Sequence, residues 1–376
     1  MSVLTSPPAP RDAAAPRPGP RGLLTPGRAG VGAWAVAMVV LPLVLRSELW
    51  LGIGVLTLIA GIGALGMQVI TGLAGQISLG HAFFMAIGAY SSAWLGADQG
   101  LPWYLWLPAA GLVSAAAGAL VAPVAVRIRG LYLAVATLAL VFIGLYAWET
   151  WTDLSGGVNG RPAAPVLFGD QDLSLGIMSG DRVILDALQS WWYFALAILL
   201  LVMFLTHNLK HSRLGRAFMA VRDKDVAAAV VGVPVTRTKT TAFVISSFFA
   251  GISGALLVSY MGYFTPGQWH LMLSVDFIAM IVIGGMGTVS GALLGALFVR
   301  AMPELVNQAS AVLPFVRKDA STDGGVTGPL LSGFLYGLVI VLILLFEPNG
   351  IRALALRGRR RLGALSRGGR EKRRAS

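Results

Sequence analysis

The sequence has no cysteine and few charged residues. Of its 376 residues, 12% are charged and 56% are hydrophobic, and none is Cys. The absence of cysteine excludes disulfides, thiolate metal sites and cysteine nucleophiles. Soluble domains carry about 25% charged residues, so roughly half that density over this length excludes an ordinary soluble enzyme.

Nucleotide-binding and zinc-protease motifs are also missing. There is no Gly-x-x-x-x-Gly-Lys-Ser/Thr, so we expect no ATP bound through a P-loop in this chain. His207 and His211 have helical spacing, but their basic neighbours favour a solvated face over a metal site. Ser78 and His81 have no acid nearby in sequence, which argues against a hydrolytic triad. We therefore predict no enzyme activity, no metal and no cofactor in this chain.

The hydrophobic residues are concentrated in blocks, several of them near the length that crosses a bilayer. The blocks run approximately over 30–45, 49–70, 81–97, 104–126, 130–147, 191–206, 240–260, 271–283, 291–312 and 329–346. They predict an all-α polytopic membrane protein with about ten transmembrane segments. Some of these segments are short and interrupted by glycine, which is typical of discontinuous membrane helices.

The basic residues lie between and after the apolar blocks. The formal net charge is +12, and this placement indicates membrane topology rather than a nucleic-acid partner. Loop 207–239 is rich in Lys and Arg, whereas loop 148–190 has six acidic residues against two arginines. The positive-inside rule therefore predicts that 127–129 and 207–239 are cytoplasmic and that 148–190 is external.

Both ends of the chain differ in composition from the rest. Residues 1–28 are rich in Pro, Ala and Arg and contain no apolar run, which predicts a disordered basic tail. Residues 352–376 hold ten Arg or Lys against one acidic residue, Glu371. We expect both tails in the cytoplasm, flanking a transmembrane permease domain over 29–351.

Glycines interrupt the apolar blocks in a repeated pattern. The sequence Gly-x-x-Gly-x-x-Ser occurs at 72–78 and again at 284–290. If residues 271–300 formed one span, the basic C-terminal tail would lie outside, so a break at the second motif is needed to keep this tail cytoplasmic. One interpretation is two related breaks beside a pathway; the alternative is close packing of helices through small residues. The candidate hinge residues are Gly72, Gly75, Gly80, Gly284, Gly285 and Gly287.

A few polar residues fall within or beside apolar blocks. Burying such groups in a membrane is costly, so they are candidates for a translocation pathway. They are Gln76, Ser78, His81 and Asp276. A position at the level of the lipid headgroups is an equally good interpretation of Asp276.

Loop 207–239 is long enough to have its own fold. Asp225 can cap a short helix over 226–231, whose apolar residues we expect to be buried. Gly232 is a suitable left-handed residue after that helix, and Pro234 prevents its continuation. Such a helix predicts either a cytoplasmic partner that supplies energy or contact with anionic lipid headgroups.

Several motifs occur in the order found in one known family. They are Thr71–Phe84 with Ile87–Tyr90, Arg129–Ala134, Ser155–Gly160, Leu214–Ala217 with Val221–Asp223, Ile283–Thr288 and Phe346–Gly350. Over about residues 45–351 the sequence resembles the LivM-type permease, a membrane subunit of branched-chain amino acid ABC importers.

The resemblance implies half of a translocation pathway for leucine, isoleucine and valine in the bacterial cytoplasmic membrane. The implied partners are a second, LivH-type permease, two cytoplasmic ATPase subunits (LivG- and LivF-type) that bind ATP and Mg, an extracytoplasmic substrate-binding protein and the lipid bilayer. Loop 213–232 would contain the coupling helix, with Gly215, Arg216, Arg222, Asp223, Ala227, Ala228 and Gly232 at the ATPase contact. Gly156, Gly157 and Asn159 would contact the binding protein.

The sequence departs from the family pattern at one place in this loop. ABC permeases often carry Glu-Ala-Ala-x-x-x-Gly, and here Val226 replaces the glutamate while the spacing to Gly232 is kept. The solute also stays open, because related permeases carry urea or short amides. A further alternative is an ATPase-independent channel or secondary transporter, against which the coupling-type loop argues.

Overall fold

A computed structural model describes residues 36–45, 47–128, 130–169, 171–179 and 182–310, with the isolated positions 316–317, 326–327, 334, 337–338 and 341–342. The chain divides into two units, Met1–Val44 and Leu45–Ser376. The described part of the first unit is a helix over 36–44 followed by no other element. The predicted tails 1–28 and 352–376 lie outside the described residues.

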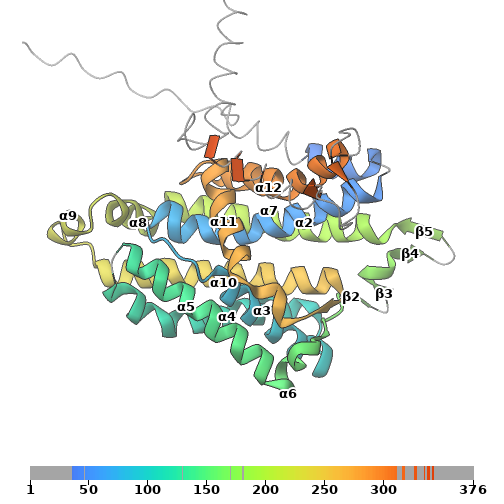
Figure 1. Cartoon of the computed structure of the whole chain (residues 1–376), viewed down its shortest axis with the longest axis horizontal. Coiled ribbons are helices and arrows are strands. Elements are labelled where there is room, and N and C mark those ends of the chain that lie inside the picture. The colour runs from blue at the N-terminus through green and yellow to red at the C-terminus, as the bar shows by residue number, and fades with distance from the viewer. Residues whose placement is uncertain are drawn as a thin grey trace, which may run out of the picture. The chain divides into compact units, whose positions relative to one another are not determined.

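The second unit is mostly helical (Figure 1). Its long helices are α2 (Glu48–Met67), α3 (His81–Ser92), α4 (Trp103–Arg127), α5 (Leu131–Thr150), α7 (Ala187–His211), α10 (Val235–Met261), α11 (Leu271–Gly284) and α12 (Val289–Ser310). Two of them continue as π-helix, α2 into η1 (Gln68–Leu73) and α3 into η2 (Ala93–Asp98). Shorter helices are α6 (Thr152–Ser155), η3 (Gly157–Asn159), η4 (Leu173–Leu175), α8 (Arg213–Asp223), α9 (Asp225–Val230) and η5 (Pro266–Trp269).

Among the described residues, five helices are long and apolar enough to cross a membrane. They cover Glu48–Leu73, Trp103–Val124, Tyr132–Thr150, Ala187–His211 and Val235–Met261, and Leu271–Gly284 is a shorter apolar helix. All the predicted apolar blocks coincide at least in part with helical residues. Of 329–346 only 334, 337–338 and 341–342 are described, and these are helical. The structure is therefore that of a multi-pass membrane protein, and the count of about ten segments stays a prediction.

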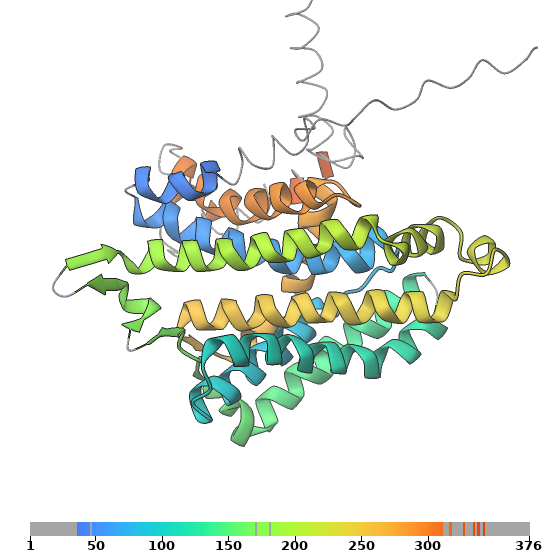
Figure 2. The same ribbon diagram turned by 180° about the vertical axis from the view of Figure 1, so that it is seen from behind.

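Helix α10 is the centre of the second unit and packs against α2, α3 and α4. On the other side of α2 lie α7 and α12, and α12 also contacts α11 (Figures 1 and 2). In an apolar 18-residue stretch of each helix, 78% is buried inside the protein for α2 and for α10, whereas only 28% is buried for α5. Because α5 exposes large apolar side chains such as Phe142 and Ile143, it has the surface expected of a helix that faces lipid or another apolar partner.

Glycines allow α10 to approach α3 closely. A Cβ at Gly254 would overlap the carbonyl oxygen of Met85, and a Cβ at Gly88 would overlap that of Gly251. Such small-residue contacts are the usual means by which membrane helices come together. The small-residue packing considered for the two glycine motifs is thus present between α3 and α10, and it is present at the second motif too, where a Cβ at Gly284 would overlap the carbonyl oxygen of Gly291 on α12.

The loops add short strand pairs to the predicted all-α fold. They are β1 (Arg161–Pro162) with β6 (Tyr263–Phe264), β2 (Leu167–Phe168) with β3 (Gln171–Asp172), β4 (Ile177–Ser179) with β5 (Arg182–Leu185), and the parallel pair β7 (Val316–Arg317) with β8 (Val326–Thr327). In the first pair Arg161 lies opposite Phe264. The Arg161 side chain is largely buried and forms an ion pair with Asp98 at 2.6 Å, so the loop is fastened to η2.

The two loops with opposite charge lie at opposite ends of the helices. Both views show α8 and α9 at one end of the unit and β2 to β5 at the other (Figures 1 and 2). The turn between α4 and α5 is at the same end as α8 and α9, because Ile128 and Gly130 line a pocket together with residues of that loop. This arrangement agrees with the separation that the charge pattern predicts.

Candidate functional site

Both predicted glycine motifs coincide with interruptions of helix. After η1 ends at Leu73, no helix forms until His81. Likewise α11 ends at Gly284 and α12 begins at Val289. Gly75 (φ 69°), Gly285 (φ 117°) and Gly287 (φ 76°) have positive φ, a backbone conformation that other residues rarely adopt. Gly72 differs from the expectation, since it lies inside η1 rather than after the helix.

The two interruptions touch each other, although they are more than 200 residues apart in sequence. A Cβ at Gly72 would come within 2.9 Å of the Gly287 nitrogen. The Gln68 side chain crosses between them, because its Nε2 donates to the carbonyl oxygens of Gly285 (3.2 Å) and Thr288 (2.9 Å). We call residues 72–80 and 284–288 the first and second glycine breaks.

Two of the pathway candidates lie at the start of α3. Ser78 and His81 are buried, and the Ser78 Oγ accepts a hydrogen bond from the Gly80 nitrogen at 3.3 Å. The His81 ring packs against Phe277 of α11 with centroids 4.7 Å apart. Asp276 precedes Phe277 on the same helix and is half-buried. The structure thus brings His81 to the part of α11 that carries Asp276.

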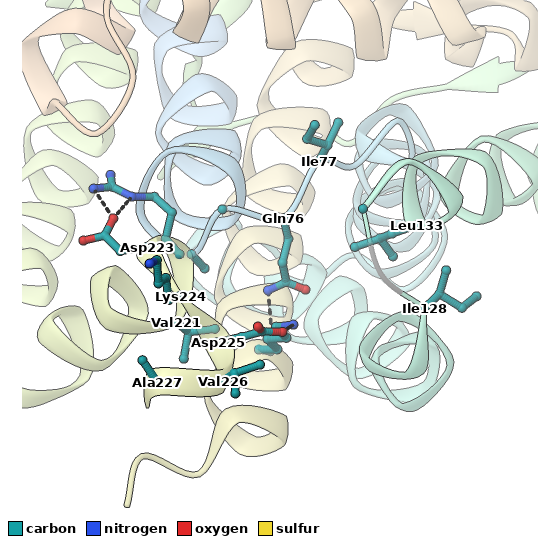
Figure 3. Close-up of a pocket in the computed structure, with 15 residues that line it drawn as sticks. Gln76, Ile77, Ile128, Leu133, Val221, Asp223, Lys224, Asp225, Val226 and Ala227 are labelled. Atoms are coloured by element: carbon teal, nitrogen blue, oxygen red, sulfur yellow. Dashed lines mark hydrogen bonds and ion pairs between the residues drawn. The ribbon is translucent and has the colours of Figure 1, made fainter. Parts of the chain in front are cut away.

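Gln76 lies elsewhere, beside the loop at the α8–α9 end. Its Nε2 donates to the Lys239 carbonyl oxygen at 3.2 Å. It also lines a pocket of about 640 Å³ between the first glycine break, the α4–α5 turn and the α8–α9 loop (Figure 3). The lining residues are Ala74, Gly75, Gln76, Ile77, Ile128, Gly130, Leu133, Val221, Arg222, Asp223, Lys224, Asp225, Val226, Ala227 and Lys239.

The short helix predicted in the loop is present as α9. Gly232 follows it with φ 86°, as expected of a residue that ends a helix. The predicted cap is wrong by one residue, because the N-cap is Lys224. Asp225 instead forms an ion pair with Lys239 at 3.4 Å, which fastens α9 to α10.

The predicted burial of α9 is wrong for most of its apolar residues. Only Ala228 is buried, with 3% of its surface exposed, whereas Val226 (65%), Val230 (83%) and Val231 (77%) are exposed. Helix α9 has only six residues, and it packs one face, that of Ala228, against the protein. Its valines therefore remain on the opposite, exposed face. They form the exposed apolar surface that we call the α9 valine face.

The coupling candidates on α8 divide by the direction of their side chains. Gly215 is buried, and a Cβ there would overlap the Leu209 carbonyl oxygen, so its role is close packing. Arg216 is exposed and its Nη1 donates to the His211 carbonyl oxygen at 3.1 Å. Arg222 reaches the first glycine break while 38% of its side chain stays exposed: its Nη1 donates to the Gly72 carbonyl oxygen at 2.9 Å, and the rest of its guanidinium pairs with Asp223.

The binding-protein candidates lie in a tightly folded turn at the opposite end. Gly156 (φ 75°) and Gly157 (φ 63°) have positive φ, and Gly157 is buried. A buried glycine cannot contact a partner directly, so its role is to shape the turn. Asn159 is exposed and its carbonyl oxygen accepts from the Tyr263 hydroxyl at 2.7 Å, next to Val158, which is 74% exposed.

Comparisons with known proteins identify the family of the chain. A family model described as the permease component of the branched-chain amino acid transport system matches residues 30–344. The chain is 33% identical over 317 residues to the high-affinity branched-chain amino acid transport system permease protein LivM of Salmonella typhimurium, covering 80% of this chain and 69% of that protein. LivM of Escherichia coli is 32% identical over 316 residues, with the same coverage. The permease LivH of Escherichia coli is 27% identical over 308 residues, covering 77% of this chain and 89% of that protein.

Proposed function

Because the chain belongs to the family of permease components of branched-chain amino acid transport systems, we propose that it forms half of the translocation pathway of an ABC importer for leucine, isoleucine and valine. Members of this family are transport subunits rather than enzymes. The observation that carries the proposal is the similarity to LivM over 80% of the chain. The junction of the α8–α9 loop with two glycine breaks supplies a physical means of coupling.

The proposed assembly contains a second, LivH-type permease. The chain resembles LivM and LivH, as expected if two related permeases face each other. Two cytoplasmic ATPase subunits, LivG- and LivF-type, would bind ATP and Mg²⁺, and an extracytoplasmic binding protein would deliver the solute. We place the complex in the bacterial cytoplasmic membrane, with α8, α9 and both tails inside and loop 148–190 outside.

The proposed coupling element is the α8–α9 loop, and the mechanism is alternating access. The α9 valine face would dock on an ATPase, since an exposed apolar surface on a loop between membrane helices indicates a protein partner. Closure of the ATPases would move α8 and α9, and the loop's contacts with the first glycine break would pass this movement to the membrane helices. Asn159 and Val158 would meet the binding protein at the other end.

We propose that Ser78, His81 and Asp276 lie on or near the path of the solute, while Gln76 belongs to the coupling junction. Replacement of Ser78 by alanine is expected to slow solute uptake about fivefold, the effect of losing one polar contact. Ser290→Ala is the matched control, because Ser290 has the corresponding place in the second motif and is exposed. Initial rates of uptake in proteoliposomes measure both, and an unchanged rate in Ser78→Ala would remove Ser78 from the path.

Uptake of labelled leucine and urea, in cells with and without this gene, tests the solute. We expect deletion to abolish leucine uptake at limiting external concentration, and the gene to restore it. Loss of urea uptake alone would show that the solute is urea, and the proposed coupling mechanism would still apply. Leucine uptake that continues when the co-expressed ATPases carry an inactivating substitution would favour a channel or secondary transporter.

A further inference from the structure

Two basic side chains of the α7–α8 hairpin reach the two glycine breaks. The Lys210 Nζ, in the last turn of α7, donates to the Gly287 carbonyl oxygen at 2.6 Å. The Arg222 Nη1, in the last turn of α8, donates to the Gly72 carbonyl oxygen at 2.9 Å. Each break thus has one backbone carbonyl bonded to a cation from a single hairpin.

The two acceptors lie where a helix ends or a turn follows a helix. Gly72 is in the last turn of η1, and Gly287 is in the turn after α11. Carbonyl groups in the last turn of a helix lack a partner within it and carry partial negative charge, so a cation at the Gly72 carbonyl is favourable. The Gly287 carbonyl lies between α11 and α12, and Lys210 supplies a hydrogen bond to it. Hydrogen bonds from charged donors are also roughly twice as strong as neutral ones.

The breaks and the hairpin form one contiguous contact. Gly72 and Gly287 approach each other so closely that a Cβ at Gly72 would lie 2.9 Å from the Gly287 nitrogen. The Arg222 stem rests on the first break, since a Cβ at Gly75 would come within 2.5 Å of its Cγ. Displacement of α8 must therefore carry Gly72 with it or break the hydrogen bond from Arg222.

The same hairpin leads directly into the α9 valine face. Only Lys224 separates the end of α8 from the start of α9, and Asp225 is paired with Lys239 of α10. A force on α9 is therefore delivered through α8 to Arg222 and through the hairpin to Lys210. No other part of the described residues shows basic side chains bonded to the carbonyls of both breaks.

We propose that Lys210 and Arg222 are positioning residues that bind the two glycine breaks to the coupling loop, so that ATPase movement changes both breaks together. The proposal rests on the function proposed above. It assigns to Arg222 a role at the first glycine break beyond the expected ATPase contact, and it adds Lys210, which the family motifs do not contain.

The test is the amount of leucine transported per ATP hydrolysed, in proteoliposomes holding the complete complex and its binding protein. In Arg222→Met and Lys210→Met we expect this ratio to fall about tenfold, because each loses a charged hydrogen bond, while ATP hydrolysis continues. Arg222→Lys, which keeps one donor, should retain most of the ratio. In the double Met variant the ratio should be little lower than in the worse single variant, since both residues act on the same pair of glycine breaks.

Arg237→Met is the control, because Arg237 is an exposed cation on α10 at the same end, and its ratio should not change. If Arg222→Met does not assemble, Lys210→Met and Lys210→Gln decide the question, because the latter keeps a neutral donor. Unchanged ratios in assembled Met variants would overturn the role proposed for Lys210 and Arg222 alone. A wild-type complex that moves no leucine with ATP would instead overturn the proposed function.

Discussion

Replacing Gly254 by alanine is expected to destabilise the protein severely. The new methyl group would overlap the backbone carbonyl oxygen of Met85, so α3 and α10 must separate. Overpacking of this kind costs about 1–3 kcal/mol, and backbone obstruction places Gly254 at the upper end. The effect should appear as a lower midpoint of thermal unfolding in detergent and a lower yield from membranes.

Gly52→Ala is the matched control for this substitution. Gly52 also lies inside a membrane helix, but the nearest atom to a Cβ there is the Tyr260 hydroxyl at 3.4 Å, an ordinary contact. Both substitutions gain about 1 kcal/mol of helix propensity, so the difference between them reports the contact with α3. Equal midpoints for the two variants would show that α3 and α10 do not cross as closely as described.

Replacing Val230 by glutamate is expected to abolish binding of the ATPase subunits. Val230 is 83% exposed on the α9 valine face, and an unpaired carboxylate buried at an apolar interface costs about 2 kcal/mol or more. Co-purification of the ATPases with the permease should fall by more than about tenfold, and ATP-driven uptake should be lost with it.

The conservative variant Val230→Ile keeps the apolar surface and should bind the ATPases normally. Undiminished co-purification and uptake in Val230→Glu would show that α9 docks elsewhere, for instance on lipid headgroups. Ala228→Arg, by contrast, does not test this interface. Ala228 is buried against the protein itself, so that change would disrupt the loop before it reached a partner.

The parts of the fold set by local sequence could be predicted. Long apolar runs give α2, α4, α5, α7 and α10, and the glycine motifs locate both breaks, because glycine is needed for the positive φ at Gly75 and Gly287. The start of α9 was misplaced by one residue, since Asp225 pairs with Lys239 from a different helix. A local pattern contains no information about such a distant partner.

The site itself depends on contacts between distant segments, and there prediction was weaker. Arg222 was expected at an ATPase surface, which stays a prediction, and nothing in its local sequence indicated its hydrogen bond to Gly72, 150 residues away. The sequence did not predict the contact of Lys210 with the second glycine break. Its one indication was a cation just after an apolar block, at the start of a basic loop. The π-helical turns of η1 and η2 leave no recognisable pattern in the residues, because they share the composition of the helices they extend.

The ion pair between Arg161 and Asp98 connects loop 148–190 to the end of a continuous helix formed by α3 and η2. Asp98 is the last residue of a continuous helical rod that starts at His81, and about 18 residues of helix span roughly 25 Å. One end of the rod is fixed to loop 148–190 and the other adjoins Gly80 of the first break. A displacement of that loop would therefore be transmitted along the helix over residues 81–98 to the first glycine break. Movement of loop 148–190 and movement of α8 would therefore act on the same glycine break, the former at Gly80 and the latter at Gly72 and Gly75, so the two ends of the unit could oppose or reinforce each other there.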